Sequence, residues 1–274
     1  MAVVMSIVNR KGGVGKSTIS AHLAAGMATM GLNVAMVDTD SQGHASLMLS
    51  MEEENGLFAA LVDKKPLQEV VRFVPPQNYS TADRPSEGNL YLLPSSALTY
   101  RIPYMLDPDD SFLFLEKMQE MSDLFALDVI VIDTAPTLGL LDGSIYLATD
   151  AYLYVTECER LSLDGIVKAV EQMQRAAKQR KQHLGRDSRV VGIIPNKLRA
   201  NTRNHRHNIR RLAEAFPGMV WSPIILGTIW TECTSVGELV FTYAPTGQEA
   251  TDAWRIVNRT VETVKSWQAT IAQN

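Results

Sequence analysis

The stretch Arg10-Lys11-Gly12-Gly13-Val14-Gly15-Lys16-Ser17-Thr18 decides how the rest of this chain is interpreted. It follows the apolar run of residues 3–8, which predicts a buried strand, and it precedes apolar residues at helical spacing that end at Gly31. A strand, a glycine-rich turn and a helix that opens with lysine and a hydroxyl residue are typical of a phosphate-binding loop. Glycines let the backbone curl with its N–H groups toward phosphate oxygens, and the helix N-terminus adds its positive dipole end. We therefore expect a nucleotide to bind at this loop.

Three side chains of the loop have distinct expected roles. Lys16 supplies positive charge at the β- and γ-phosphates of the nucleotide, and Ser17 supplies a hydroxyl ligand for Mg²⁺. Lys11, at the front of the loop, is a second lysine that an ordinary phosphate loop does not need. It is either a solvent-facing side chain or a further charge for phosphoryl transfer, which depends on neutralising the phosphate oxygens.

Apolar runs that predict strands recur along the chain, at residues 3–8, 33–37, 90–93, 128–132, 152–155 and 190–194. Helical patterns lie between most of them. This alternation, with strands that are apolar throughout, predicts an α/β fold with a mostly parallel twisted sheet and helices on both faces. The 274 residues show no internal repeat, so we predict a single domain over residues 1–274, with a C-terminal helix at about 247–271 docked on it.

Carboxylates follow two of the predicted strands. Asp133 ends the 128–132 run, which places it at the carboxyl edge of the sheet beside the phosphate loop, where it can hold Mg²⁺ through water. The alternative for Asp133 is a turn or helix-capping residue. Asp40 lies just beyond the 33–37 run, in a segment that should contact the γ-phosphate, and Asp38 competes with it for a role there.

Two segments accompany the loop at residues 11–18, namely Asp38-Thr39-Asp40-Ser41-Gln42-Gly43 and Val129-Ile130-Val131-Ile132-Asp133-Thr134-Ala135-Pro136. In the order and spacing of these three segments, the chain resembles the ParA/MinD family of deviant Walker-type P-loop ATPases over about residues 1–260. Ser41 stands where the family usually has proline, and Ala135 stands where proline is common. A later segment, residues 155–165, is similar to the ParA branch.

The resemblance implies ATP and Mg²⁺ as cofactors and ATP hydrolysis with weak intrinsic turnover. It implies that Asp40 orients the attacking water and that Ser17, Asp40 and Asp133 serve the metal. It further implies that Lys11 crosses to the ATP of a second subunit, so that ATP holds a face-to-face homodimer together. The implied nucleotide contacts are Lys11, Gly12, Gly13, Val14, Gly15, Lys16, Ser17 and Thr18.

Asn196 is the candidate for reading the base. It follows the predicted strand at 190–194, and an amide at a strand's carboxyl end can pair with the N6 and N7 edge of adenine. The dipeptide Asn196-Lys197 is similar to the start of a guanine-reading Asn-Lys-x-Asp motif, but residue 199 is Arg in place of the carboxylate. The sequence therefore favours ATP over GTP.

Charge is strongly segregated in this chain, although the net charge is only −4. Residues 168–211 contain 13 of the 26 Lys and Arg residues and two of the 30 acids, a distribution typical of a polyanion-binding surface. A helix predicted from Thr202 to about Phe216 gathers its arginines on one side and Ile209, Leu212, Ala213 and Phe216 on the other. Without interleaved aromatics, these basic residues are expected to contact phosphates of duplex DNA without reading bases. The predicted DNA-binding residues are Lys197, Arg199, Arg203, Arg206, Arg210 and Arg211.

Three functions remain open from the sequence. The leading one is a ParA-like ATPase that binds nucleoid DNA and segregates or positions a cargo, a partition complex or a protein body, with a stimulating adaptor protein. The second is a MinD-like ATPase on the membrane surface, and the third is a nucleotide-gated interaction protein with negligible turnover. The two cysteines have no metal-ligand spacing, and no apolar stretch approaches the roughly 20 residues that span a bilayer, so we expect a cytoplasmic protein. The C-terminal stripe Trp254, Val257, Val261, Val264 and Ile271 is expected to dock on the core and not on a membrane.

Overall fold

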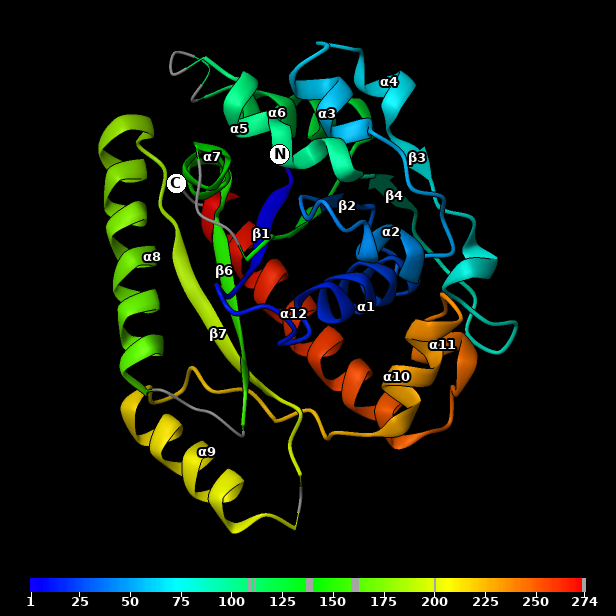
Figure 1. Ribbon diagram of the computed structural model, residues 1–274, viewed down its shortest axis with the longest axis vertical. Coiled ribbons are helices and arrows are strands. Elements are labelled where there is room, and N and C mark those ends of the chain that lie inside the picture. The colour runs from blue at the N-terminus through cyan, green and yellow to red at the C-terminus, as the bar shows by residue number, and fades with distance from the viewer. Residues whose placement is uncertain (108–109, 111, 137–139, 159–162, 200, 273–274) are drawn as a thin grey trace.

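The computed structural model describes residues 1–107, 110, 112–136, 140–158, 163–199 and 201–272. The strands of this part of the chain form one twisted sheet in the order β3-β4-β2-β5-β1-β6-β7, with all neighbours parallel except the antiparallel pair β3 and β4 (Figure 1). The strands are β1 (Val3–Val8), β2 (Val34–Asp38), β3 (Arg72–Phe73), β4 (Leu90–Leu93), β5 (Val129–Asp133), β6 (Ala151–Glu157) and β7 (Arg189–Asn196). The predicted α/β fold with a mostly parallel sheet is therefore confirmed. The sequence missed β3, because two residues are too few to show a periodic pattern.

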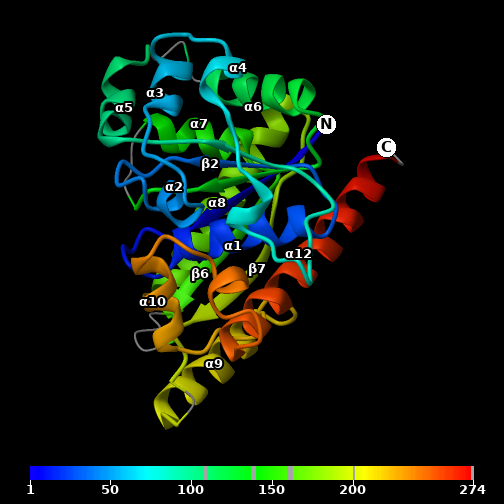
Figure 2. The same cartoon turned by 90° about the vertical axis from the view of Figure 1, so that its right-hand side faces the viewer.

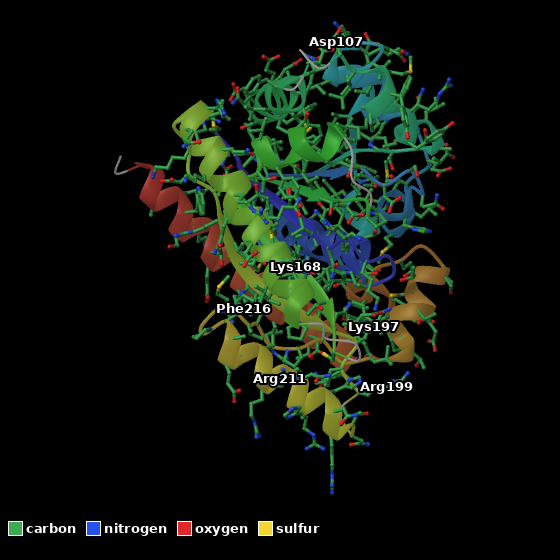
Figure 3. The ribbon with its side chains drawn as sticks, turned by 60° about the vertical axis from the view of Figure 1, so that its left-hand side comes forward. Asp107, Lys168, Lys197, Arg199, Arg211 and Phe216 are labelled. Carbon is green, nitrogen blue, oxygen red and sulfur yellow. The ribbon has the colours of Figure 1, made fainter. Side chains whose placement is uncertain are left out.

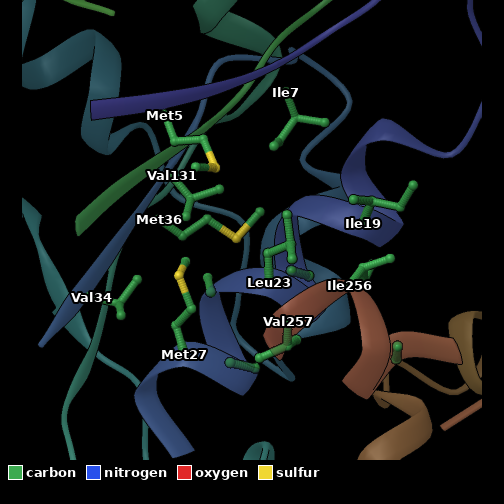
Figure 4. Close-up of a cluster of buried hydrophobic side chains, with 14 of the residues drawn as sticks. Met5, Ile7, Ile19, Leu23, Met27, Val34, Met36, Val131, Ile256 and Val257 are labelled. Carbon is green, nitrogen blue, oxygen red and sulfur yellow. The ribbon is translucent and has the colours of Figure 1, made fainter. Parts of the chain in front are cut away.

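Helices cover both faces of this sheet. On one face, α1 and α12 pack against side chains such as Met5, Met36 and Val131 (Figure 4). On the other face, α3, α6 and α7 pack against the alternate residues of the same strands, among them Val4 and Ile130, because successive strand residues point to opposite faces. The helices are α1 (Lys16–Thr29), α2 (His44–Met48), α3 (Gly56–Leu61), α4 (Leu67–Val70), α5 (Ile102–Met105), α6 (Leu113–Leu124), α7 (Leu140–Ala148), α8 (Leu163–Leu184), α9 (Arg203–Ala215), α10 (Thr228–Ser235), α11 (Val240–Tyr243) and α12 (Gln248–Ala272), with short 3₁₀ turns at Pro76–Asn78 and Ala97–Arg101.

The C-terminal helix α12 runs alongside α1 (Figures 1 and 2). Gly26 of α1 allows this close approach, because a Cβ there would lie 2.4 Å from Cγ2 of Val257. Along α12, Val257, Val261, Val264 and Trp267 are buried in the same core. The apolar side of α12 therefore faces the protein interior, and its exposed side is polar.

The loops after β1, β2, β5, β6 and β7 all leave the sheet at the same edge, because these strands are parallel. Strand β1 lies inside the sheet, between β5 and β6. In open parallel sheets, ligands bind at the carboxyl ends of the strands where the strand order reverses. The fold thus places the predicted phosphate loop, which follows β1, at the position where a ligand site is expected.

Candidate functional site: a nucleotide pocket

A broad cavity of about 1060 Å³ opens at this edge of the sheet. The glycines of the phosphate loop and the first turn of α1 form one wall, and the segments after β2, β5 and β7 form the others. Residues 224–227 and part of α10 also line the cavity. Among the predicted nucleotide contacts, Gly12, Gly13, Gly15, Lys16, Ser17, Thr18 and Asn196 line this cavity.

The phosphate loop has the backbone shape that its glycines predict. Gly13 and Gly15 have φ angles of 74° and 96°, in the left-handed region that side chains disfavour. Gly15 caps α1 but has no side chain to bind the first amides of the helix, so these amides are available to phosphate oxygens. At Gly15 a Cβ would also lie 2.4 Å from Nδ2 of Asn196. Both the backbone angle and the lack of space therefore favour glycine at this position.

Asp38 and Asp133 face each other across β2 and β5, where their Cα atoms are register partners. Both side chains are fully buried, and each leaves one oxygen, Oδ2, without a hydrogen-bond partner among the described residues. Burial raises the pKa of Asp133 to about 6, although Ser17 and Ser20 stabilise its charge, with the Ser20 hydroxyl 3.0 Å away. Burial and the charge of Asp133 raise the pKa of Asp38 well above its usual range.

Two buried carboxylates with unsatisfied oxygens fit a divalent cation, because a cation would offset both the charge and the missing hydrogen bonds. Ser17 lines the cavity beside them and supplies a hydroxyl oxygen, the ligand type that Mg²⁺ prefers. The residues present therefore suit Mg²⁺. Ser17 and Asp133 are two of the three predicted metal residues, and the metal role of the third, Asp40, which lines the same cavity, stays a prediction. Asp38 is a buried carboxylate that the sequence did not assign to the metal.

The structure separates the two aspartates that compete for the water-positioning role. Asp40 is half-buried and lines the cavity, whereas Asp38 lies beneath it. Asp38 Oδ1 accepts a hydrogen bond from the backbone N–H of Asp40 at 3.0 Å, and the hydroxyl of Ser95 donates to the Asp40 carbonyl at 2.6 Å. Asp38 thus supports the loop that presents Asp40, and the catalytic role of Asp40 stays a prediction.

The two lysines of the phosphate loop have different environments. Lys16 is buried, lines the cavity, and has its pKa lowered by burial against the opposing charges of Asp133 and Asp40. The Lys11 side chain is half exposed and forms an ion pair with Glu157 of its own chain. Glu157, the last residue of β6, lies in the segment that is similar to the ParA branch, but the sequence analysis assigned it no role; its position at a strand's carboxyl end was the available signal.

Asn196 and Lys197 both contact the phosphate loop. Asn196 Nδ2 donates to the carbonyl of Val14 at 2.8 Å, and its Oδ1 accepts from the N–H of Lys197 at 2.8 Å. The amide therefore braces the loop, and adenine recognition by Asn196 stays a prediction. The Lys197 ammonium pairs with Glu157 at 2.9 Å and so lies at the nucleotide pocket, apart from the arginines of α9 with which it was grouped.

Helix α9 extends over nearly the predicted range, and Thr202 occupies the N-cap position without a capping side-chain hydrogen bond. The side chains Arg203, Arg206, His207, Arg210 and Arg211 are all exposed, as the sequence predicted. Helix α9, with Arg211 labelled, lies at one edge of the molecule (Figure 3).

The assignment of Ala213 to the apolar side of α9 was wrong, because Ala213 is exposed. His205, by contrast, is buried and accepts a hydrogen bond from the N–H of Arg199 at 3.1 Å.

Not every basic side chain of residues 168–211 lies on the surface. The side chain of Arg180 is 1% exposed and forms an ion pair with Asp150 at 2.6 Å, so it stabilises the protein interior and is not available to a partner.

Among the described residues, every helix is too short or too polar to span a bilayer.

Glu159 and residues 160–162, within the segment similar to the ParA branch, lie outside the described part of the chain.

Comparison with known proteins agrees with the site. Residues 2–185 match the family described as AAA domain. The chain is 26% identical over 257 residues to the sporulation initiation inhibitor protein Soj of Bacillus subtilis, covering 91% of this chain and 94% of Soj. It is 26% identical over 247 residues to the chromosome partitioning protein ParA of Myxococcus xanthus, covering 88% of this chain and 81% of that protein. The septum site-determining protein MinD of Pyrococcus horikoshii, solved with Mg-ADP, shares the fold with a TM-score of 0.73 at 20% identity, over 95% of this chain and 96% of MinD. The chain therefore belongs to the AAA domain family and, within it, to the ParA/MinD family of P-loop ATPases.

Proposed function

We propose that this chain is a ParA-type partition or positioning ATPase of the cytoplasm and nucleoid. In the proposed cycle it binds ATP and Mg²⁺, forms a homodimer, and binds duplex DNA without sequence preference while it carries a cargo. An adaptor protein then stimulates hydrolysis and ends the bound state. The observation on which the proposal depends most is the exposed arginine face of α9, formed by Arg203, Arg206, Arg210 and Arg211.

This face suits phosphate contacts. Within α9, Glu214 is the single acidic residue, and it lies near the C-terminal end of the helix. A surface helix that is merely solvated normally mixes charges of both signs, so four exposed arginines indicate a polyanionic partner. Phosphate contacts fix a protein on DNA but read no sequence, which suits binding anywhere along a nucleoid.

The residues of the pocket can carry out hydrolysis in defined roles. The amides of the phosphate loop and the ammonium of Lys16 bind the phosphate oxygens, and Ser17 and Asp133 hold Mg²⁺. When bound, Mg²⁺ supplies charge neutralisation at the phosphates. Asp40 accepts a hydrogen bond from the attacking water and so orients it. Asp38 fixes the loop that presents Asp40, through the hydrogen bond to its backbone.

The position of Lys11 supports the proposed dimerisation. Its half-exposed ammonium lies beside Glu157 and outside the group of residues that line the pocket of its own chain. A lysine so placed is available to the ATP of a second subunit, where it would neutralise developing charge in trans.

A membrane-surface function receives less support from the structure. The apolar side of α12 packs into the core, where Val257 and Val261 are buried. An interfacial helix must instead present its apolar side to lipid.

Fluorescence anisotropy with a random-sequence labelled duplex tests the proposal. We expect binding with a non-hydrolysable ATP analogue and little with ADP or without nucleotide. The triple variant R203E/R206E/R210E should lose at least tenfold in DNA affinity at moderate salt and keep its ATP affinity. The matched control K64E/K65E/K265E reverses as many exposed charges away from α9 and should bind DNA far better than the α9 variant.

The salt dependence gives a second measure. Each phosphate contact adds about −0.9 to the slope of log affinity against log salt, so losing six contacts in a dimer should flatten the slope by about 5. Equal DNA binding by both triple variants would refute the α9 surface. Binding to anionic liposomes in place of DNA would support the membrane function instead.

A further inference from the structure

The two lysines at the front of the pocket share one carboxylate. Glu157 binds Lys11 through Oε2 and Lys197 through Oε1, the latter at 2.9 Å. Its side chain is only 18% exposed, whereas the lysines are 49% and 40% exposed. Burial alone would raise the pKa of Glu157, but hydrogen bonds and charges from Lys11 and Lys197 outweigh it and hold the pKa below its usual range. We refer to Lys11, Glu157 and Lys197 as the carboxylate cluster.

The backbone around the carboxylate cluster is held in place on each side. Asn9 accepts a hydrogen bond from the N–H of Lys11 at 2.8 Å and donates to the carbonyl of Val155 in β6 at 2.6 Å. Glu157 is the register partner of Asn196 on β7. The phosphate loop and the ends of β6 and β7 are therefore joined where the cluster forms.

Lys197 contacts the cluster from a disfavoured backbone conformation. Its φ angle is 57°, in the left-handed region that an ordinary side chain avoids at a cost of about 1–2 kcal/mol. In this conformation its ammonium also donates to the carbonyl of Gly13 at 2.5 Å. Lys197 thus contacts both the Glu157 carboxylate, which Lys11 also binds, and the backbone of the phosphate loop.

The ammonium of Lys11 has three donors, but to reach a phosphate in a second subunit its long, flexible side chain would have to turn outward, away from Glu157 of its own chain. We therefore expect dimerisation through Lys11 to break its pair with Glu157. A partly buried carboxylate left without a partner would oppose this step. Lys197 removes that penalty, because it remains on Glu157 after Lys11 has left.

We propose that Glu157 is a positioning residue that holds Lys11 within its own chain in the resting monomer and releases it to the second subunit's ATP, with Lys197 as the partner that remains. The proposal rests on the proposed function of Lys11 in trans. It assigns a resting state to that lysine and a role to Glu157 and Lys197 that is separate from DNA binding.

Chemical labelling tests the resting contact without any dimer. In the nucleotide-free protein, acylation by a water-soluble amine reagent is followed by mass spectrometry at each lysine. We expect Glu157→Gln to raise the labelling rate of Lys11 about two- to five-fold, the range for loss of a partly exposed ion pair. Lys181, whose exposed pair with Asp187 is distant in sequence, is the internal control and should label unchanged. An unchanged rate at Lys11 would overturn the proposal.

Dimerisation with saturating ATP analogue, measured by light scattering or sedimentation, tests the release. Glu157→Gln should tighten the dimer about two- to five-fold, and Lys197→Met should weaken it, because Glu157 would then lose its last partner. The double variant should resemble Glu157→Gln, since it has no carboxylate to leave unpaired. Weakening by all three variants would mean simple damage to the phosphate loop and would overturn the proposal.

The two experiments separate this proposal from the proposed function. If the wild type fails to dimerise with any nucleotide, both the dimer and the release of Lys11 are refuted, and the labelling result still reports whether Glu157 holds Lys11. If dimers form normally but Lys11→Ala also dimerises and hydrolyses normally, the role of Lys11 in trans is refuted, and with it the proposed release.

Discussion

Protonation of His22 should destabilise the fold below neutral pH. His22 lies on α1, is fully buried, and packs edge-on against Trp230 and Phe241 at centroid distances of 5.1 and 5.3 Å. Its Nε2 accepts a hydrogen bond from the N–H of Val240 at 3.0 Å, so Nδ1 carries the proton and donates to the carbonyl of Thr18 at 2.6 Å. Both ring nitrogens are therefore used in the neutral form, and the charged form would lose the bond to Val240.

The size of the effect follows from the pKa. Burial lowers the pKa of His22 to about 4, from 6.5 in the unfolded chain. The unfolded state therefore binds the extra proton first, so this contribution is complete above pH 6.5 and is lost as the pH falls toward 4. At 1.36 kcal/mol per pKa unit, about 2 kcal/mol of unfolding free energy should be lost between pH 7.5 and 5.0.

Urea unfolding of the nucleotide-free protein at several pH values measures this loss. The variant His22→Gln is neutral throughout, and other titrating groups, including Asp133, contribute equally to both proteins. Wild type should therefore lose about 2 kcal/mol more than the variant over this pH range. His183→Gln, which changes an exposed histidine on α8, is the matched control and should follow wild type. Parallel pH profiles for wild type and His22→Gln would refute the reasoning.

Three further predictions concern catalysis, packing and a buried charge. Asp40→Ala should keep ATP affinity, measured by a fluorescent analogue, and lose at least about 100-fold in phosphate release, because the water loses its orienting group; wild-type turnover would exclude this role. Gly26→Ala should lower the free energy of unfolding by about 1–3 kcal/mol, because the new Cβ overlaps Val257, and Val257→Ala in the same chain should restore part of it; thermal unfolding of the single and double variants decides. Arg180→Met should lower the free energy of unfolding by about 3–5 kcal/mol, because Asp150 loses its ion-pair partner. The additional change Asp150→Asn should recover part of that loss, again measured by thermal unfolding.

Much of the fold could be predicted from the sequence because its signals are local. The apolar runs at β1, β5 and β6 are long and continuous, and the glycines of the phosphate loop mark a backbone turn that few other residues allow. The amphipathic pattern of α9 likewise placed four arginines on the surface. The same pattern failed for Ala213, which is exposed. It also did not identify His205, which is buried and accepts a hydrogen bond from the backbone N–H of Arg199, a contact that depends on the loop before the helix.

The sequence by itself thus determined four features: the phosphate loop, the succession of strands and helices along the chain, the position of Asp133 at the end of a strand, and the basic character of residues 168–211. The tertiary structure decided which distant side chains meet. Glu157 lies 146 residues from Lys11 in the chain, and Asn196 lies 182 residues from Val14. These contacts depend on β6 lying parallel between β1 and β7, so that the carboxyl ends of the three strands converge. Sequence periodicity tells which face of a strand is buried, but strand order and register arise from packing of the whole sheet, and they determine which charges become partners.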